Sequence, residues 1–374
     1  MIDEGKITNQ EALTMAVVIT VTELFLTFMA ELVSVGQTGT WQILLLSAVF
    51  AGAFYLPAAA LMEGYPGKSL VEVGEELAGP YLNGLFVFIY LVICLGSSAL
   101  VIRQYAERVL TISIPELPVS VAVAVMYLGS LVACHLGLEA MARSSFFIIY
   151  FIGFTVLLAS VLTYPYWCFD YLFPLAGPGV GKVVKEGVFR SSLMCGVPLF
   201  LGLIFPSLKK PAIRLAGLGA FAIGGLTMSL TMLAMLMTFG VSALQEMVLP
   251  TYEMTRLIYF GRFLQRLESI FVPVWALLGM MYVAFGTYVG SIALTRYLRL
   301  PYHRPFLLPV AVLTYALALL PANAAQTFWL DFHLLRAYGF LPAFFLPALL
   351  FGLDRLKKKG MRRGGGKGGG SNAG

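Results

Sequence analysis

The sequence predicts an all-α polytopic membrane protein with about ten transmembrane helices. Of its 374 residues, 59% are hydrophobic and only 12% are charged, whereas a soluble domain has about 25% charged residues. Apolar stretches that approach the roughly 20 residues needed to cross a bilayer recur along the whole chain. The predicted spans are 12–33, 41–62, 81–101, 117–135, 144–163, 191–208, 215–239, 269–295, 306–320 and 338–353.

These spans leave no stretch long enough for a soluble domain. Residues 1–359 are therefore predicted to form a single transmembrane domain, and the glycine-rich residues 360–374 a flexible tail. The polar start of the chain has neither a basic n-region nor a small-residue cleavage site. We therefore expect the first span itself to act as the insertion signal.

The basic residues predict an orientation in the membrane rather than a nucleic-acid partner. The formal net charge is +6, and a basic cluster follows the last span: Arg355, Lys357, Lys358, Lys359, Arg362, Arg363 and Lys367. Such a cluster is typical of a cytoplasmic anchor that also meets membrane lipids. Ten spans then place both termini in the cytoplasm. In this topology Arg103, Arg108 and Arg336 are assigned to outer segments.

Two connections between spans have an amphipathic pattern. Residues 69–78 read as a short helix on the cytoplasmic face, and residues 251–268 read as a helix in the outer interface. Glu253 and Arg256 are spaced for an ion pair on the second of these helices. The alternative for both is a solvated connector that orients the neighbouring spans.

The sixth span contains the strongest sign of an interrupted helix. Within residues 189–211, Gly196, Val197 and Pro198 stand in an apolar stretch. Proline removes a backbone donor and glycine tolerates unusual backbone angles, so a regular helix is not expected to continue through them. Broken backbone inside a membrane is tolerated only within protein or along a wet cavity, and secondary transporters use it to hold ligands. The alternative is a simple proline kink.

The ten spans divide into five plus five, which suits an inverted repeat whose discontinuous helices are spans one and six. Span one has no glycine or proline, but Thr20 and Thr22 carry hydroxyls that can bond backbone carbonyls and loosen a helix. Glu23 lies near the middle of this span, where a carboxylate is costly unless it is neutralised, paired or hydrated. It is interpreted as a ligand contact or a proton-binding group, with a structural bond to a neighbouring helix as the alternative.

Spans three and eight contribute further polar side chains. Tyr90, Cys94 and Ser97 fall on one helical face of span three, and Tyr282 and Thr287 lie in span eight. Tight helix packing is the alternative explanation for such faces. The candidate ligand-binding residues are Thr20, Thr22, Glu23, Leu24, Tyr90, Cys94, Ser97, Cys195, Gly196, Val197, Pro198, Tyr282 and Thr287.

Neither an enzyme nor a bound cofactor is indicated. The four cysteines have no CxxC spacing and the three histidines are far apart in the sequence, so we expect no metal site. The chain contains no phosphate-binding loop, nucleophile elbow or flavin fingerprint.

Five short motifs occur in a fixed order along the chain: YPGKSL at 65–70, FPSLKKP at 205–211, PTYE at 250–253, FLQRLE at 263–268 and YHRP at 302–305. In this order and spacing they resemble the spore germination permease family, within the amino acid–polyamine–organocation superfamily. The resemblance extends from about residue 6 to residue 359. It implies a ten-helix permease-like fold and the B-subunit role in a nutrient-germinant receptor. It also implies A and lipoprotein C partner subunits in the spore inner membrane.

The same resemblance implies a small nutrient ligand, typically an amino acid, held between spans one, three, six and eight. Family members often have glycine in the middle of span one and an acidic residue after the span-six glycine. Here Glu23 and its neighbours occupy the first place and Val197 the second. We hypothesise that the carboxylate of the pocket has moved to Glu23. A proton-coupled amino acid transporter is the alternative function, and a scaffold or channel component with a vestigial pocket is a third.

Overall fold

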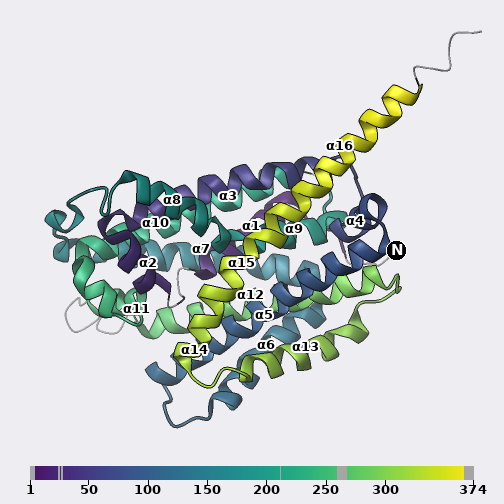
Figure 1. Ribbon diagram of the computed structural model, residues 1–374. Helices are drawn as coiled ribbons and strands as arrows, with labels where there is room; N and C mark the ends of the chain where they lie inside the picture. Colours follow the sequence, from purple (N-terminus) through teal and green to yellow (C-terminus); the bar gives the residue numbers. More distant parts are fainter. Residues whose placement is uncertain (1–4, 24–25, 27, 211, 259–267, 366–374) are drawn as a thin grey trace, which may run out of the picture.

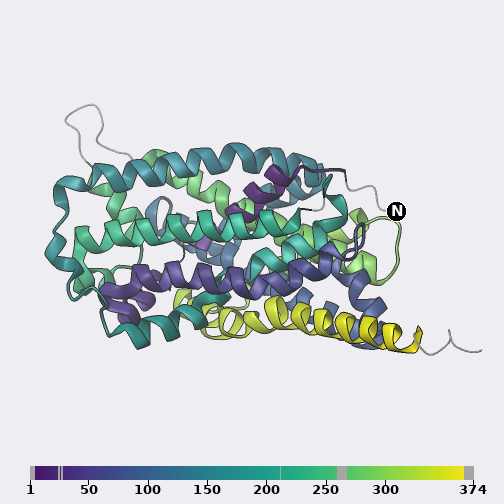
Figure 2. The same cartoon turned by 90° about the horizontal axis from the view of Figure 1, so that it is seen from above.

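Long helices that run roughly along one direction make up the bundle (Figure 1). The computed structural model covers residues 1–374 and describes all of them except 1–4, 24–25, 27, 211, 259–267 and 366–374. The described start of the chain and α4 (Leu70–Ala78) lie at one end of the bundle, and α2 (Phe28–Gly36) and α11 (Pro250–Arg256) lie at the opposite end. The view from above shows the same lengthwise arrangement (Figure 2).

Every predicted span coincides with helical structure. The first half consists of α1 (Asn9–Thr22) with α2, α3 (Thr40–Glu63), α5 (Pro80–Ile112), α6 (Val119–Leu136) and α7 (Leu138–Leu162). The second half consists of α8 (Val180–Arg190) leading into α9 (Gly196–Ile204), α10 (Ile213–Glu246), α12 (Glu268–Tyr297), α13 (Arg304–Leu319), and α14 (Ala324–Trp329) leading through α15 (Ala337–Phe340) into α16 (Leu346–Gly365). Eight helical stretches of the described chain are long and apolar enough to cross a membrane, and α13 is a shorter apolar helix. The chain is thus a multi-pass integral membrane protein.

The two halves repeat one order of elements: an interrupted first span, a long second span, a short helix and a long third span. The second spans α3 and α10 pack along each other, and so do the third spans α5 and α12. The short helices α4 and α11 follow the second span of each half and lie at opposite ends of the bundle (Figure 1). This arrangement is the one expected of a five-plus-five inverted repeat.

The first predicted amphipathic connector forms α4, and the second starts with α11. Ser69 caps α4 through a reciprocal capping box with Glu72, which satisfies backbone donors that the first turn leaves without helical partners. In α11, Glu253 and Arg256 form the predicted ion pair at 3.1 Å. Residues 259–267 of the second connector lie outside the described residues.

Two predicted span boundaries were wrong. The third span was expected to end at Val101, but α5 continues to Ile112, so Arg103 and Arg108 lie on a buried helix rather than in an outer loop. Arg336 is likewise buried within the helical stretch of the last span. A hydropathy scale includes only the cost of placing a charge in an apolar environment. It does not include the favourable interactions that these guanidinium groups make with their partners. Arg103, for example, pairs with Glu107 at 2.6 Å.

At the N-terminal end of the bundle, segments of the two halves contact each other. Ile7 and Leu208 form a parallel bridge in which the Ile7 amide donates to the Ser207 carbonyl at 2.9 Å. Arg214 at the start of α10 pairs with Glu63 at the end of α3 at 2.6 Å. α16 extends to Gly365, and the division between a membrane domain and a tail at residues 359 and 360 stays a prediction.

Candidate functional site

The sixth span is interrupted, as predicted, and the break falls at Cys195. A 3₁₀ turn over Ser191–Met194 precedes it, and α9 begins at Gly196. Pro198 therefore lies in the first turn of α9, where its missing amide costs no helical hydrogen bond. A Cβ at Gly196 would stand 2.8 Å from Ile19 Cγ2, so the glycine lets α9 approach α1 closely.

The first span, which corresponds to the sixth in the repeat, is also interrupted. α1 ends at Thr22, Glu23 is its C-terminal cap, and α2 begins at Phe28. The hydroxyls behave as expected: Thr20 donates to the Val17 carbonyl at 2.9 Å and Thr22 donates to the Val18 carbonyl at 2.7 Å. The predicted site residue Leu24 lies outside the described residues.

A small cavity lies where α1, α5, α9 and α12 meet. Five predicted site residues line it: Cys94, Ser97, Cys195, Gly196 and Tyr282. The rest of its wall is mainly apolar and includes Ile19, Leu199, Phe200 and Phe285. Its volume is about 40 Å³, and one water needs roughly 10–15 Å³ on this measure. The cavity therefore has room for no more than a few waters in this conformation and is too small for an amino acid.

Other predicted site residues lie around this cavity without lining it. Thr287 shares a 2.8 Å hydrogen bond with Tyr127 of α6. Thr20 packs against Gly224 of α10, where an added Cβ would stand 2.2 Å from its hydroxyl. Val197 and Pro198 are buried within α9 away from the cavity wall. Val197, Pro198 and Thr287 closely follow glycines that line the cavity, but a helix presents only part of its circumference to any one neighbour, so these side chains do not line it.

Tyr90 is also buried outside the cavity wall, one turn before Cys94 on α5. Its hydroxyl has no hydrogen-bond partner in the part of the chain that the structure describes. The structure therefore gives the aromatic ring a packing environment and leaves the predicted ligand contact of Tyr90 as a prediction.

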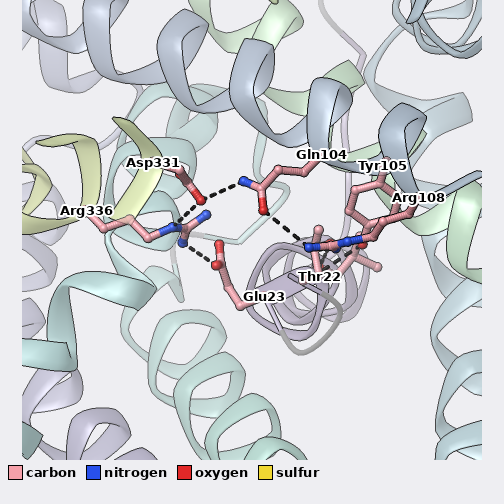
Figure 3. Close-up of polar contacts among 8 residues, drawn as sticks. Thr22, Glu23, Gln104, Tyr105, Arg108, Asp331 and Arg336 are labelled. Carbon is pink, nitrogen blue, oxygen red and sulfur yellow. Dashed lines mark hydrogen bonds and ion pairs between the residues drawn. The ribbon is translucent and has the colours of Figure 1, made fainter. Parts of the chain in front are cut away.

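Glu23 belongs to a buried ionic network that joins three segments distant in the sequence (Figure 3). Its carboxylate pairs with the Arg336 guanidinium. Arg336 Nε also pairs with Asp331 Oδ2 at 3.0 Å, and Gln104 Nε2 donates to the same oxygen at 2.9 Å. Arg108 Nη2 donates to Gln104 Oε1 at 3.4 Å, which completes a path from the α1 break to α5. We call these five residues the ionic network.

The ionic network is almost entirely removed from solvent. Glu23 and Asp331 are each 2% exposed, Arg336 is 5% exposed and Arg108 is 4% exposed. The network contains two carboxylates, which both pair with Arg336, and a second guanidinium group, that of Arg108, so its formal charges cancel. Removing one partner of such a buried set leaves an uncompensated charge, which is far more costly than losing an exposed ion pair. Asp331 Oδ1 has no hydrogen-bond partner among the described residues, so this carboxylate retains capacity to accept another bond.

A π-helix over Leu330–Arg336 places Asp331 and Arg336 on one side of the last span. Residues five apart point roughly 140° away from each other on a regular α-helix. The wider π turn closes hydrogen bonds between residues i and i+5 and brings such a pair close together, and it occurs frequently at functional sites. The local widening of this helix is therefore what aims both side chains at the α1 break.

The cavity and the ionic network are neighbours. Gly339 of α15 follows Arg336 by three residues, and a Cβ there would stand 3.1 Å from Cys195 Sγ. Cys195 in turn lines the cavity. The last span thus touches both breaks, with charge at one and a close packing contact at the other.

Sequence reasoning found Glu23 but missed Gln104, Arg108, Asp331 and Arg336. All three charged members of that group were treated as outer-loop charges or left unassigned. One signal was available: the five-residue spacing of Asp331 and Arg336 fits a π turn. It is too weak to use alone, because the same spacing is common in loops.

Comparisons with known proteins agree with this architecture. The family model described as "Spore germination protein" matches residues 6–327. Spore germination protein KB of Bacillus subtilis (strain 168) is 25% identical over 268 residues, which cover 68% of this chain and 70% of that protein.

Solved structures with a similar fold include those of a bacterial manganese transporter. The Eremococcus coleocola manganese transporter in complex with an aromatic bis-isothiourea compound has a TM-score of 0.54 at 15% identity, covering 92% of this chain and 76% of that one. A histidine-to-alanine variant of that transporter has a TM-score of 0.56 at 14% identity, covering 93% and 80%. At such identities the likeness concerns the fold alone. The family match over most of the chain, on a bundle folded like these transporters, shows that this protein belongs to the spore germination permease family.

Proposed function

We propose that this protein is the permease-like B subunit of a spore nutrient-germinant receptor. In this proposal a small nutrient, with amino acids as the first class to test, binds near the membrane midplane between the breaks in α1 and α9. Binding stabilises one of two arrangements of the helices. Partner A and C subunits read that change in the spore inner membrane, with both termini of this chain in the cytoplasm.

The observation that carries the proposal is the meeting of two interrupted helices in a member of this family. The likeness to Spore germination protein KB supports a role in germination. The cavity beside Gly196 and the buried charge of Glu23 support a ligand-responsive centre rather than a passive scaffold. Because the cavity has only about 40 Å³, the proposal requires that it widens when a nutrient binds.

Glu23→Gln tests the centre directly. We expect spores that carry this variant to germinate more weakly at limiting nutrient, while the protein still inserts and assembles, because the amide keeps the shape but loses the charge that holds Arg336. The measurement is the germination rate against nutrient concentration, with the amount of receptor quantified in the same spores.

Glu31→Gln is the matched control, since Glu31 lies on α2 in the same span but outside the ionic network. An unchanged response of the Glu23→Gln spores at limiting nutrient would discard the proposed role of this carboxylate. A screen of amino acids, sugars and nucleosides for thermal stabilisation of the purified protein would identify the nutrient class.

A proton-coupled amino acid transporter is the second candidate, and the buried Glu23 carboxylate favours it because transporters use such groups as proton sites. Purified protein in liposomes separates the two functions. Uptake of an amino acid driven by a proton gradient, and lost in Glu23→Gln, supports transport. Nutrient-dependent stabilisation without uptake supports a sensor.

A further inference from the structure

A much larger cavity lies at the end of the bundle opposite the N-terminus, which we call the outer cavity. Its volume is about 860 Å³, against about 40 Å³ for the cavity beside Gly196. The last turns of α5, the end of α10 with the following loop, α11 and the start of α14 surround it. Ligand pockets are commonly about 300–1,000 Å³, so this volume suits a small molecule without rearrangement.

The outer cavity carries both signs of charge. Arg108 lines it as a buried cation, and Glu107, Glu246 and Glu253 line it as carboxylates. Glu107 pairs with Arg103 at 2.6 Å and Glu253 pairs with Arg256 at 3.1 Å. Glu246 is exposed at the end of α10 and forms no ion pair within the described part of the chain. A buried guanidinium and an uncompensated carboxylate therefore share one cavity.

Aromatic side chains complete the wall. Tyr252 of α11 and Phe328 of α14 line the same cavity. A third cavity, between α5, α12, α13 and the last span, has about 500 Å³ and is lined entirely by apolar and glycine residues such as Phe88 and Leu313. None of its described lining residues can pair with a charged ligand, so the outer cavity is the better candidate site for one.

We propose that the outer cavity is the first docking site for a small zwitterion, with its carboxylate at Arg108 and its ammonium at Glu246. An arginine fork matches a carboxylate in two hydrogen bonds, and a glutamate accepts from an ammonium. The zwitterion is the nutrient ligand of the proposed receptor, so this inference rests on the proposed function.

The docking site is connected to the ionic network through shared residues. Gln104 and Arg108 line the outer cavity and are also the last members of the ionic network. A ligand carboxylate at Arg108 competes with Gln104 Oε1 for the guanidinium. Gln104 donates a hydrogen bond to Asp331, and Asp331 pairs with Arg336, which also pairs with Glu23. Docking thereby favours a rearrangement around the α1 break, on the way to the cavity beside Gly196.

Thermal stabilisation of the full purified chain tests the charge requirement. The probes are the twenty standard amino acids one at a time, then the amide and the deaminated acid of whichever amino acid stabilises most, with D-glucose as a neutral probe. We expect the amide and the deaminated acid to bind about tenfold more weakly than the amino acid, because each lacks one charge-assisted contact. Equal binding of all three forms would overturn the inference.

Two variants locate the contacts. Glu246→Gln should weaken the amino acid and its amide about two- to fivefold and leave the deaminated acid unchanged. Arg108→Lys should weaken the amino acid about tenfold, because the ammonium lacks the guanidinium fork. Glu116→Gln is the matched control for Glu246→Gln, since Glu116 is exposed between α5 and α6 outside the cavity.

The outcomes separate this inference from the proposed function. If neither Glu246→Gln nor Arg108→Lys changes the affinity for the amino acid, while spores still respond to the nutrient, the docking site is overturned and the proposed receptor function stands. D-glucose as the only stabilising probe leads to the same conclusion. Absence of both binding and nutrient response overturns the receptor, and the docking site with it. If Arg108→Lys fails to fold, the exposed Glu246→Gln decides alone.

Discussion

The two helix breaks differ in what surrounds them. The break at Cys195 in the sixth span is surrounded mainly by apolar side chains and leaves a cavity of about 40 Å³. The break after Thr22 in the first span is held by buried charges from two other spans. The comparison shows that an interrupted backbone does not by itself define a chemistry. The neighbouring segments define it. Here the last span places the charged Arg336 at the break after Thr22 and the close-packed Gly339 at the break at Cys195.

The contrast also separates two kinds of stability. Side chains around the break at Cys195 are held by close packing, in which small changes of volume matter. Side chains around the break after Thr22 are held by paired charges, in which the loss of one partner matters most. Substitutions at the two breaks should therefore differ in size and in the way they are rescued.

The largest effect is expected from Arg336→Met. The change leaves Glu23 and Asp331 as two buried carboxylates without their shared cation, and breaking such a set costs about 3–5 kcal/mol. Thermal unfolding of the purified protein should show a large fall in melting temperature. The double variant Glu23→Gln with Arg336→Met should be more stable than Arg336→Met alone. A single variant as stable as the parent would mean that the pairing carries little energy.

A smaller effect is expected from Gly196→Ala. The new Cβ would stand 2.8 Å from Ile19 Cγ2, and overpacking of this kind costs about 1–3 kcal/mol. Adding Ile19→Leu removes the Cγ2 methyl that clashes while keeping the volume of the side chain, so the double variant should recover part of the lost stability. Gly153→Ala on α7 is the control, because a Cβ there meets nothing within 4 Å. Equal effects at the two glycines would remove the packing explanation.

The smallest effect is expected from Thr287→Val. It removes the 2.8 Å hydrogen bond with Tyr127, and such a bond contributes about 1 kcal/mol. Because Thr287 lies outside the cavity, stability should fall slightly while the nutrient response stays unchanged. Ser97→Ala, which alters the cavity wall, should change the response instead. A lost response in Thr287→Val would move the ligand toward α6.

Much of the fold could be predicted because it follows from local patterns. Apolar length located each span, and Gly196 with Pro198 located an interrupted helix. The first break was predicted only from the five-plus-five division of the spans and from hydroxyls such as Thr22, because that span has no glycine or proline. For the candidate site, five predicted residues do meet at one cavity, whereas Thr20 and Thr287 face other helices.

The sequence by itself determined a membrane protein of two similar halves. The length of each apolar stretch and the position of each helix breaker are properties of one segment, so they can be read without knowing its neighbours. Only the tertiary structure decided that Glu23 is paired with Arg336, since that partner lies 313 residues away in the chain. Hydropathy treats a charge near the end of an apolar stretch as a loop residue, because the energy of a lone charge in lipid is unfavourable. Packing against another helix supplies the opposite charge, and that contact is absent from any single stretch of sequence.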